Sequence, residues 1–450
     1  MEDILKQKFI SEFNNNKDII LSGSNGSFSK YKIKAFEHFI EKGLPDKTDE
    51  NWRYSDLNKV ILLEFVGLFE RPVEDLQFKD IFKCDVPQLN SIFLQIVNGW
   101  FPQTDKNLTI HKNGMITGSF AAAIKEYPEL VEKHYKNANQ KNHNGLEHLN
   151  TAIANDGFFI YVPDNIIVEQ PVQVVNIVYY KEDLNIFQRN LVITGKNSKI
   201  QLVICDHSMY FNKSFINSYT QIIAEPNSVV DYNKLQNYSN ITSQYNSTEI
   251  FLKRDSRVIS NILTLHGGFT RNDIKVSLEE PNAEVKLNGL YLMDRVQHID
   301  NFTYIEHKVP HCSSNEKYKG ILDDKATGAF NGKILVEPDA QKTNAFQINK
   351  NILLTENTTI NTKPQLEIYA DDVKCSHGAT IGQLDDNAMF YLRSRGISQA
   401  EARMLLMYAF AYEVIKEINI EPLRERIDDL VSKRLRGEMS RCNHCAIRCS

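Results

Sequence analysis

The pattern of hydrophobic and polar positions divides this chain of 450 residues into three parts and a tail. In the middle part, short runs rich in Val, Ile, Tyr and Phe alternate with Asn, Gly, Asp and Pro, as strands alternate with turns. On both sides of it, apolar residues recur at spacings of three and four, which predicts helices. We therefore expect an N-terminal helical domain at 1–155, a β core at 156–384, a C-terminal helical domain at 385–437 and a Cys-rich tail at 438–450.

The β core is longer than a single sandwich or barrel needs. A solenoid absorbs such length by adding coils, because each coil buries the apolar edge of its neighbour. The apolar runs show no strict repeat period, however, so the pattern favours a β-solenoid without fixing it.

Three helices are expected after the β core, and the middle one is unusual. In SQAEARMLLMYAFAYEVIKEI, residues Ala402 to Tyr412 leave almost no polar face. A helix that is apolar all round must be covered all round. Either the next helix and the β core cover it together, or part of it docks another protein through Met and aromatic side chains.

Composition and charge narrow the class of protein. The formal net charge is -5, which gives no sign of a nucleic-acid partner. The N-terminus, MEDILKQKFISEFNNNK, lacks the basic start and apolar core of a signal peptide. The apolar run Met404 to Tyr412 is far below the roughly 20 residues that cross a bilayer. We expect a cytoplasmic protein that binds neither nucleic acid nor membrane.

Common catalytic signatures are missing from the sequence. It contains no phosphate loop, no G-x-S-x-G elbow, no H-E-x-x-H and no dinucleotide-binding G-x-G-x-x-G. HGGF at 266–269 reads as a turn between strands. The histidines and the cysteine of the segment 298–312 match no compact ligand template, and neighbouring strands could carry them apart.

The cysteines favour free thiols over disulfides. There are seven, an odd number, and four of them lie far apart in sequence. In the tail, Cys442, Cys445 and Cys449 form C-x-x-C-x-x-x-C, whose thiolates could share one metal ion or cluster. The other interpretation is an incidental tail, since chain ends are usually unconstrained.

The stretch DDVKCSHGAT places a thiol and an imidazole together. Alternation along a strand puts Val373, Cys375 and His377 on one face, with Cys375 and His377 about 6 to 7 Å apart along the chain. They are within reach of a common ion, but two ligands are too few to hold it alone. Either another chain completes the site, or the pair is a buried Cys and a hydrogen-bonded His.

The last third of the chain resembles a known family. The run NKNILLTENTTINTKPQLEIYADDVKCSHGATIGQLDDNAMFYLRSRGI closely resembles the signature region of the SufB/SufD family of iron-sulfur cluster assembly scaffold proteins of the Suf system. The resemblance extends back through NEKYKGILDDKATGAFNGKILVEPDAQKTNAFQ and, more weakly, to ENWRYSDL at 50–57, so that only the Cys tail lies outside it. CSHGA stands where the SufB branch has a different, glutamate-bearing sequence, which favours the SufD branch.

The resemblance implies a fold and partners. The fold is mainly β, a right-handed parallel β-helix flanked by N-terminal and C-terminal helical domains. The partners are a SufB-like paralogue, at the ends of the β-helix, and a SufC-like ABC ATPase, on the C-terminal helices near Ser398 to Ile418. For the ATPase we expect Met404, Leu405 and Tyr408 as docking residues.

The resemblance also implies a site and a role. His377, with Cys375 beside it, lies at the SufB interface and helps to build a transient iron-sulfur cluster there, while the isolated chain holds no cofactor tightly. The chain is then a scaffold subunit rather than an enzyme.

Two other classes of function remain open. An enzyme built on a β-helix, such as a lyase or hydrolase, would need carboxylates or basic residues that converge in one groove, and the sequence shows no such cluster. A stand-alone metal or cluster carrier would use the Cys tail and Cys375.

Overall fold

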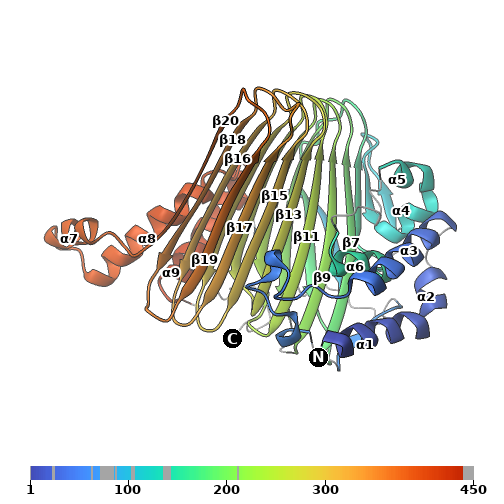
Figure 1. Ribbon diagram of the computed structural model, residues 1–450, viewed down its shortest axis with the longest axis horizontal. Helices are drawn as coiled ribbons and strands as arrows, with labels where there is room; N and C mark the ends of the chain where they lie inside the picture. The colour runs from blue at the N-terminus through green and yellow to red at the C-terminus, as the bar shows by residue number, and fades with distance from the viewer. Residues whose placement is uncertain are drawn as a thin grey trace.

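The β core is a parallel β-solenoid of about eight turns with helices at both ends, which confirms the predicted fold (Figure 1). The computed structural model describes residues 2–22, 26–61, 64–70, 86, 89–102, 107–134, 143–209 and 212–438. Strands alternate along the chain between two sheets, so each coil contributes one strand to each sheet.

The odd-numbered strands form the first sheet. Its parallel part consists of β5 (Phe158–Val162), β7 (Leu184–Thr194), β9 (Ser214–Ala224), β11 (Thr242–Leu252), β13 (Phe269–Leu278), β15 (His298–His307), β17 (Thr327–Val336) and β19 (Thr359–Ile368). The turn expected at HGGF joins two of the coils, since β12 ends at His266 and β13 begins at Phe269.

The even-numbered strands other than β4 (Ile116–Ser119) form the second sheet, which is parallel throughout. It consists of β2 (Ile92–Val97), β6 (Val172–Val178), β8 (Lys199–Ser208), β10 (Val229–Asn237), β12 (Arg257–His266), β14 (Glu284–Met293), β16 (Ser313–Leu322), β18 (Asn344–Leu353) and β20 (Lys374–Gly382).

Parallel pairing stacks equivalent residues of successive coils into columns. Val258 pairs with Val285 of the next coil, and Ala345 pairs with Cys375 in the same way. Alternate residues of each strand point into the solenoid, where both sheets contribute aliphatic side chains to one core. A slip of one residue would exchange the inner and outer faces, so the core fixes the register.

The corners where the first sheet passes into the second share a backbone feature. From the β5–β6 corner to the β17–β18 corner, one residue at each has a positive φ, between 56° and 64°, a conformation that Asn and Asp tolerate better than most residues. Side-chain hydrogen bonds link some of these residues from coil to coil, as from Asn197 to Asn165 at 2.8 Å. The residues are Asn165, Asn197, Asn227, Asp255, Asn282, His311 and Lys342.

The N-terminal region is only partly helical. Its helices are α1 (Glu2–Asn15), α2 (Lys17–Ser22), α3 (Gly26–Lys42), α4 (Phe120–Glu126), α5 (Pro128–His134) and α6 (Gly145–Ile153). It also contains the strands β1 (Val66–Gly67), β2, β3 (Leu108–Ile110) and β4 (Ile116–Ser119).

Three of these strands tie the region to the solenoid, and the first, β1, pairs in parallel with β7. β2 pairs with β6 in the second sheet, and β4 runs antiparallel to β5 in the first. The helical expectation for 1–155 therefore missed strands whose partners lie after residue 155, while the boundary at 155 itself stays a prediction.

Helix α6 joins the N-terminal helices to the outer face of the first sheet. Its N-cap, Asn144, accepts hydrogen bonds from the backbone N–H groups of Leu146 and Glu147, which completes a capping box. The Asn150 side chain donates to the backbone carbonyls of Gln188 and Asn217 on two adjacent strands. Figure 1 shows α6 beside β7 and β9, with α3 next to α6.

The three expected C-terminal helices are confirmed as α7 (Asp386–Ser394), α8 (Gln399–Ile415) and α9 (Glu421–Leu435). Asp385 caps α7, and the Ser398 hydroxyl accepts from the Glu401 backbone N–H at the start of α8. Helices α8 and α9 pack on the outer face of the second sheet, whereas α7 projects away from the solenoid (Figure 1). No helix among the described ranges is long and apolar enough to cross a membrane.

Candidate functional site

Cys375 and His377 lie on β20, the last strand of the second sheet. Among the described strands, β20 pairs with β18 alone, so its other edge is open. Cys375 pairs with Ala345 and His377 with Gln347, and both of these β18 residues are fully buried in the solenoid. The two side chains therefore occupy inner positions of the last coil, which confirms that they share a face.

The two residues differ in their surroundings. His377 is exposed, whereas Cys375 is half-buried and packs against the solenoid core. Burial raises the pKa of the Cys375 thiol, and a hydrogen bond from the Ala345 backbone offsets this only in part. Because a metal binds the thiolate, Cys375 must lose a proton when it ligates.

At this place the described residues contribute too few ligands for a closed metal site. Within the described residues, no three His, Cys, Asp or Glu side chains gather closely enough to hold an ion. Four ligands are usual for zinc and for iron-sulfur clusters. Cys375 and His377 are therefore at most part of a site.

Polar side chains lie behind His377 inside the solenoid, and sequence reasoning missed them. We call Leu287, Glu316, Gln347 and His377, which pair in this order from β14 to β20, the His377 column. Gln347 Nε2 donates to Glu316 Oε2 at 2.6 Å, and burial raises the pKa of the Glu316 carboxyl to about 7. The sequence alone did not reveal the length of each coil. Only the pairing register between successive coils shows that Glu316 and Gln347 lie behind His377.

The expected docking residues on α8 are unevenly exposed. Met404 is 8% exposed, while Leu405 and Tyr408 are half-buried. The Tyr408 hydroxyl donates to the Asp428 carboxylate of α9 at 2.5 Å. Of the three, Leu405 and Tyr408 offer side-chain surface to a partner, and their docking role stays a prediction.

One stripe of α8 is covered from within the chain. Met407, Ala411, Val414 and Ile415 pack with the apolar side of α9 and the outer face of the second sheet. The interpretation that α9 and the β core cover the helix is thus confirmed for this stripe. The other side, with Tyr412 at 41% exposed, remains open.

Helix α7 adds the most exposed aromatic side chains of this end. Phe390 is 75% exposed and Tyr391 57%, and no residue of α7 is buried. Such a helix buries little within its own chain, so it is available to a partner.

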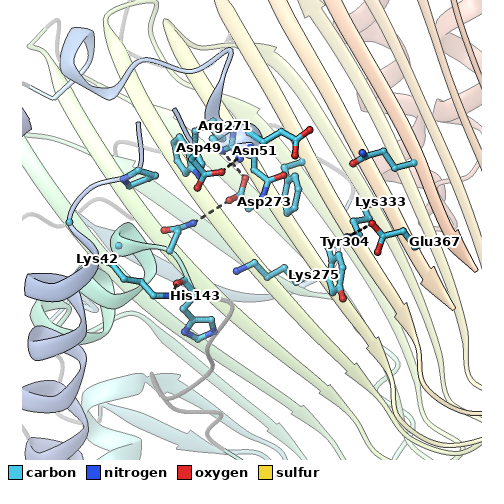
Figure 2. A pocket seen from close by; sticks show the side chains of 18 residues that line it. Lys42, Asp49, Asn51, His143, Arg271, Asp273, Lys275, Tyr304, Lys333 and Glu367 are labelled. Carbon is cyan, nitrogen blue, oxygen red and sulfur yellow. Dashed lines mark hydrogen bonds and ion pairs between the residues drawn. The ribbon is translucent and has the colours of Figure 1, made fainter. Parts of the chain in front are cut away.

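A separate pocket of about 660 Å³ lies between the N-terminal segment and the outer face of the first sheet. Figure 2 shows Arg271, Asp273 and Lys275 on one wall, with Asp49 and Asn51 of the covering segment nearby. Arg271 pairs with Asp273 at 2.8 Å, and its guanidinium lies 3.7 Å from the Trp52 ring centroid.

The charges of this pocket are matched within the chain. Lys275 pairs with Glu147 of α6 at 2.6 Å, and Lys333 pairs with Glu367 at 2.8 Å. The first pair joins α6 to β13, and Glu50 of the ENWRYSDL segment pairs with Lys363 of β19, which explains the pocket as a structural joint.

The remaining sequence candidates do not gather into a site. His307 bonds Ser314 inside the solenoid at 2.9 Å, whereas His298 bonds Thr327 at 2.8 Å. Cys312 is buried in the core, so the segment 298–312 is divided among separate structural contacts, as expected. Cys442, Cys445 and Cys449 lie outside the described residues, and their ligand role stays a prediction.

Comparison with known proteins identifies similar families along most of the chain. A family model described as "SUF system FeS cluster assembly, SufBD core domain" matches residues 177–410. A second, "SufBD protein N-terminal region", matches residues 4–174. The first covers the solenoid from β6 to α8, including Cys375 and His377.

Individual relatives agree with these matches. The iron-sulfur cluster assembly protein SufD of Escherichia coli is 26% identical over 89% of this chain and 92% of its own length. SufD of Bacillus subtilis is 28% identical over 74% of this chain and 78% of its own. An iron-sulfur cluster assembly SufBD family protein of Synechocystis is 28% identical over 87% of both chains.

Proposed function

This chain belongs to the SufBD family of the SUF system for iron-sulfur cluster assembly, and we propose that it is a non-catalytic scaffold subunit of a cytoplasmic assembly complex. In this proposal a SufB-like paralogue covers the last coil, and a SufC-like ATPase binds the C-terminal helices. The nascent iron-sulfur cluster is the cargo, and His377 with Cys375 supplies this chain's share of its ligands.

The observation that carries the proposal is the open last coil. Its inner positions hold Cys375 and His377, whereas the equivalent positions one coil earlier are fully buried Ala345 and Gln347. Strands β19 and β20 each have one free edge among the described strands, and such edges readily pair with another chain. A partner at this end would cover the coil and add the missing ligands.

The C-terminal helices support a second contact. Leu405, Tyr408 and Tyr412 of α8 and Phe390 and Tyr391 of α7 retain exposed surface outside the stripe that α9 covers. Aromatic residues are enriched at protein interfaces. We assign this surface to the ATPase, since it lies on α7, which projects from the solenoid, and on the side of α8 that α9 and the second sheet leave uncovered.

The first experiment is co-expression of the tagged chain with the SufB-like and SufC-like proteins of the same organism, followed by native mass determination. A complex of one copy of this chain, one paralogue and two ATPase subunits is expected. A chain that purifies alone and carries metal would instead favour the stand-alone carrier.

The site is tested in that complex with His377→Ala. Cluster yield should fall by about tenfold or more, because a ligand is lost, while complex formation is retained. The matched control is Ser376→Ala, an exposed neighbour on the same strand whose side chain points to the outer face. Normal cluster yield in the His377 variant would refute the site.

A further inference from the structure

Gln347 is an unusual residue for the core of a solenoid. It lies on β18, directly behind His377 in the His377 column, and it is fully buried. Its Nε2 donates to Glu316 Oε2 at 2.6 Å, one coil deeper. The carboxamide is thus anchored on the side away from His377.

The opposite sheet leaves space for this side chain. A Cβ added at Gly332 of β17 would lie 2.3 Å from Gln347 Nε2, which is closer than real Cβ atoms come to a neighbour. Glycine at this position therefore lets the carboxamide extend across the core, where the Glu316 bond fixes its direction.

The carboxamide oxygen of Gln347 is left without a partner. Oε1 is buried and accepts no hydrogen bond within the described part of the chain. Leaving a buried acceptor unsatisfied destabilises a fold, so such atoms are a minority in folded proteins. The amide nitrogen is held by Glu316 of the coil before, and the residue that follows Gln347 in register on the next coil is His377.

We propose that Gln347 is a positioning residue for His377: its Oε1 accepts a ring N–H of the imidazole and leaves the other ring nitrogen to ligate iron. The inference rests on the proposed role of His377 and adds what holds the ring. A neutral imidazole carries its proton on one nitrogen only, so an acceptor for that proton selects the tautomer and the ring orientation.

An amide suits this place better than a carboxylate. Glu316, the acidic member of the column, is separated from His377 by Gln347 and is fully buried. The neutral carboxamide fixes the orientation of the His377 ring without adding a negative charge beside an anionic cluster. The carboxyl group anchors the amide, and the amide orients the ligand.

The test measures the His377 ring by ¹⁵N NMR on the full chain with labelled histidine, and His377→Ala identifies the signals. In the wild-type chain one tautomer should dominate at neutral pH. Gln347→Met, which keeps the length and removes the acceptor, should give a mixture of tautomers. Its cluster yield in the complex should fall about tenfold, the size expected when a ligand loses its hydrogen-bond partner.

Two further variants separate positioning from mere packing. Gln365→Met makes the same change on the outer face of β19, and it should alter neither the tautomer nor the yield. The double exchange Glu316→Gln with Gln347→Glu restores a donor and an acceptor in the column, and it should recover the single tautomer. This exchange also answers the case in which Gln347→Met fails to fold.

The outcomes distinguish this inference from the proposed function. If Gln347→Met leaves the His377 tautomer unchanged, the inference is wrong, whatever His377 does for the cluster. If the tautomer changes as expected but His377→Ala gives normal clusters, Gln347 positions the ring and the proposed cluster role is wrong.

Discussion

The last coil and the coil before it share a backbone and differ in their surroundings. Residues of β20 continue the columns of β18 in register, from Lys374 opposite Asn344 to Gly382 opposite Ile352. Yet Gln347 and Asn349 are fully buried, whereas His377 and Ala379 are exposed. The difference is the missing next coil, so the last coil has inner positions that nothing in the described chain covers.

This contrast shows how a repeat architecture can make a site. In the inner coils, buried polar groups can be paired only within the chain, as the Tyr291 hydroxyl is with Asn351 Oδ1 at 2.5 Å. In the last coil the same positions are free to carry groups that meet another molecule. The end of the solenoid thus provides an oriented surface without disturbing the packed core.

The largest expected effect compares glycines in the two settings. A Cβ at Gly320 would lie 2.0 Å from the Tyr291 ring, whereas a Cβ at Gly378 of β20 meets nothing within 4 Å. Gly320→Ala should therefore lower the free energy of unfolding by about 3 kcal/mol, at the upper end of overpacking costs. Gly378→Ala should change it by less than about 0.5 kcal/mol. Urea unfolding of the two variants measures both, and equal losses would show that the last coil is as closely packed as the inner ones.

The second prediction concerns pH and the inner carboxyl group. Burial raises the pKa of Glu316 from 4.5 to about 7, so the folded chain holds this proton more tightly than the unfolded chain does. The resulting stabilisation is complete below pH 4.5 and is lost as the pH rises to about 7. Relative to Glu316→Gln, the wild-type chain should lose about 2 to 3 kcal/mol between pH 5 and 8.

Urea unfolding of both chains across that range provides the measurement. The quantity to follow is the difference in the free energy of unfolding between the wild-type chain and the variant, because the contributions of other titrating groups cancel in this difference. A difference that stays constant with pH would mean that water reaches Glu316 and that the column is open.

The smallest expected effect concerns ATPase binding by α8. Like the solenoid, this helix has a covered side and an open side. Leu405→Glu should weaken ATPase binding about tenfold, or about 1.4 kcal/mol, with little change in the stability of the chain. Met404→Glu, at a buried position, should instead destabilise the chain by about 2 kcal/mol. Binding titration and thermal unfolding of both variants distinguish the two sides. Unchanged binding by the Leu405 variant would remove this part of α8 from the interface.

Much of the fold could be predicted from local pattern. The caps Asp385 and Ser398 and the apolar stripe of α9 were sufficient for the C-terminal helices, because these signals act within one turn. The strand β2 could not be recognised, since its partner β6 lies far along the chain, beyond α6. A single apolar segment does not reveal such pairing.

The repeat was present in the sequence, but in the corners rather than in the strands. Asn or Asp with a positive φ recurs at the corners of successive coils, at Asn197, Asn227, Asp255 and Asn282. The strand runs hide this period because inner columns mix residue types, as where Leu287 precedes Glu316. Counting turn residues would have revealed the coils.

Only part of the site could be predicted, because local patterns do not reveal the pairing between coils. Alternation along one strand was enough to place Cys375 and His377 on one face. That face proved to be the inside of an open coil, with Gln347 behind it, and this depends on pairing between adjacent coils. The exposure of His377 depends on where the stacking stops, which no local pattern encodes.

Because successive coils stack strand on strand, the number of coils determines the length of the solenoid. Neighbouring strands lie about 4.8 Å apart, so the distance from the N-terminal helices to His377 is set by the number of coils. Gain or loss of a whole coil would move His377 by one such step and keep the faces aligned. Insertion of one residue within a strand would turn the faces over. Over evolution, this chain can therefore change length by whole coils or at its corners, and the length of the solenoid changes only in fixed increments.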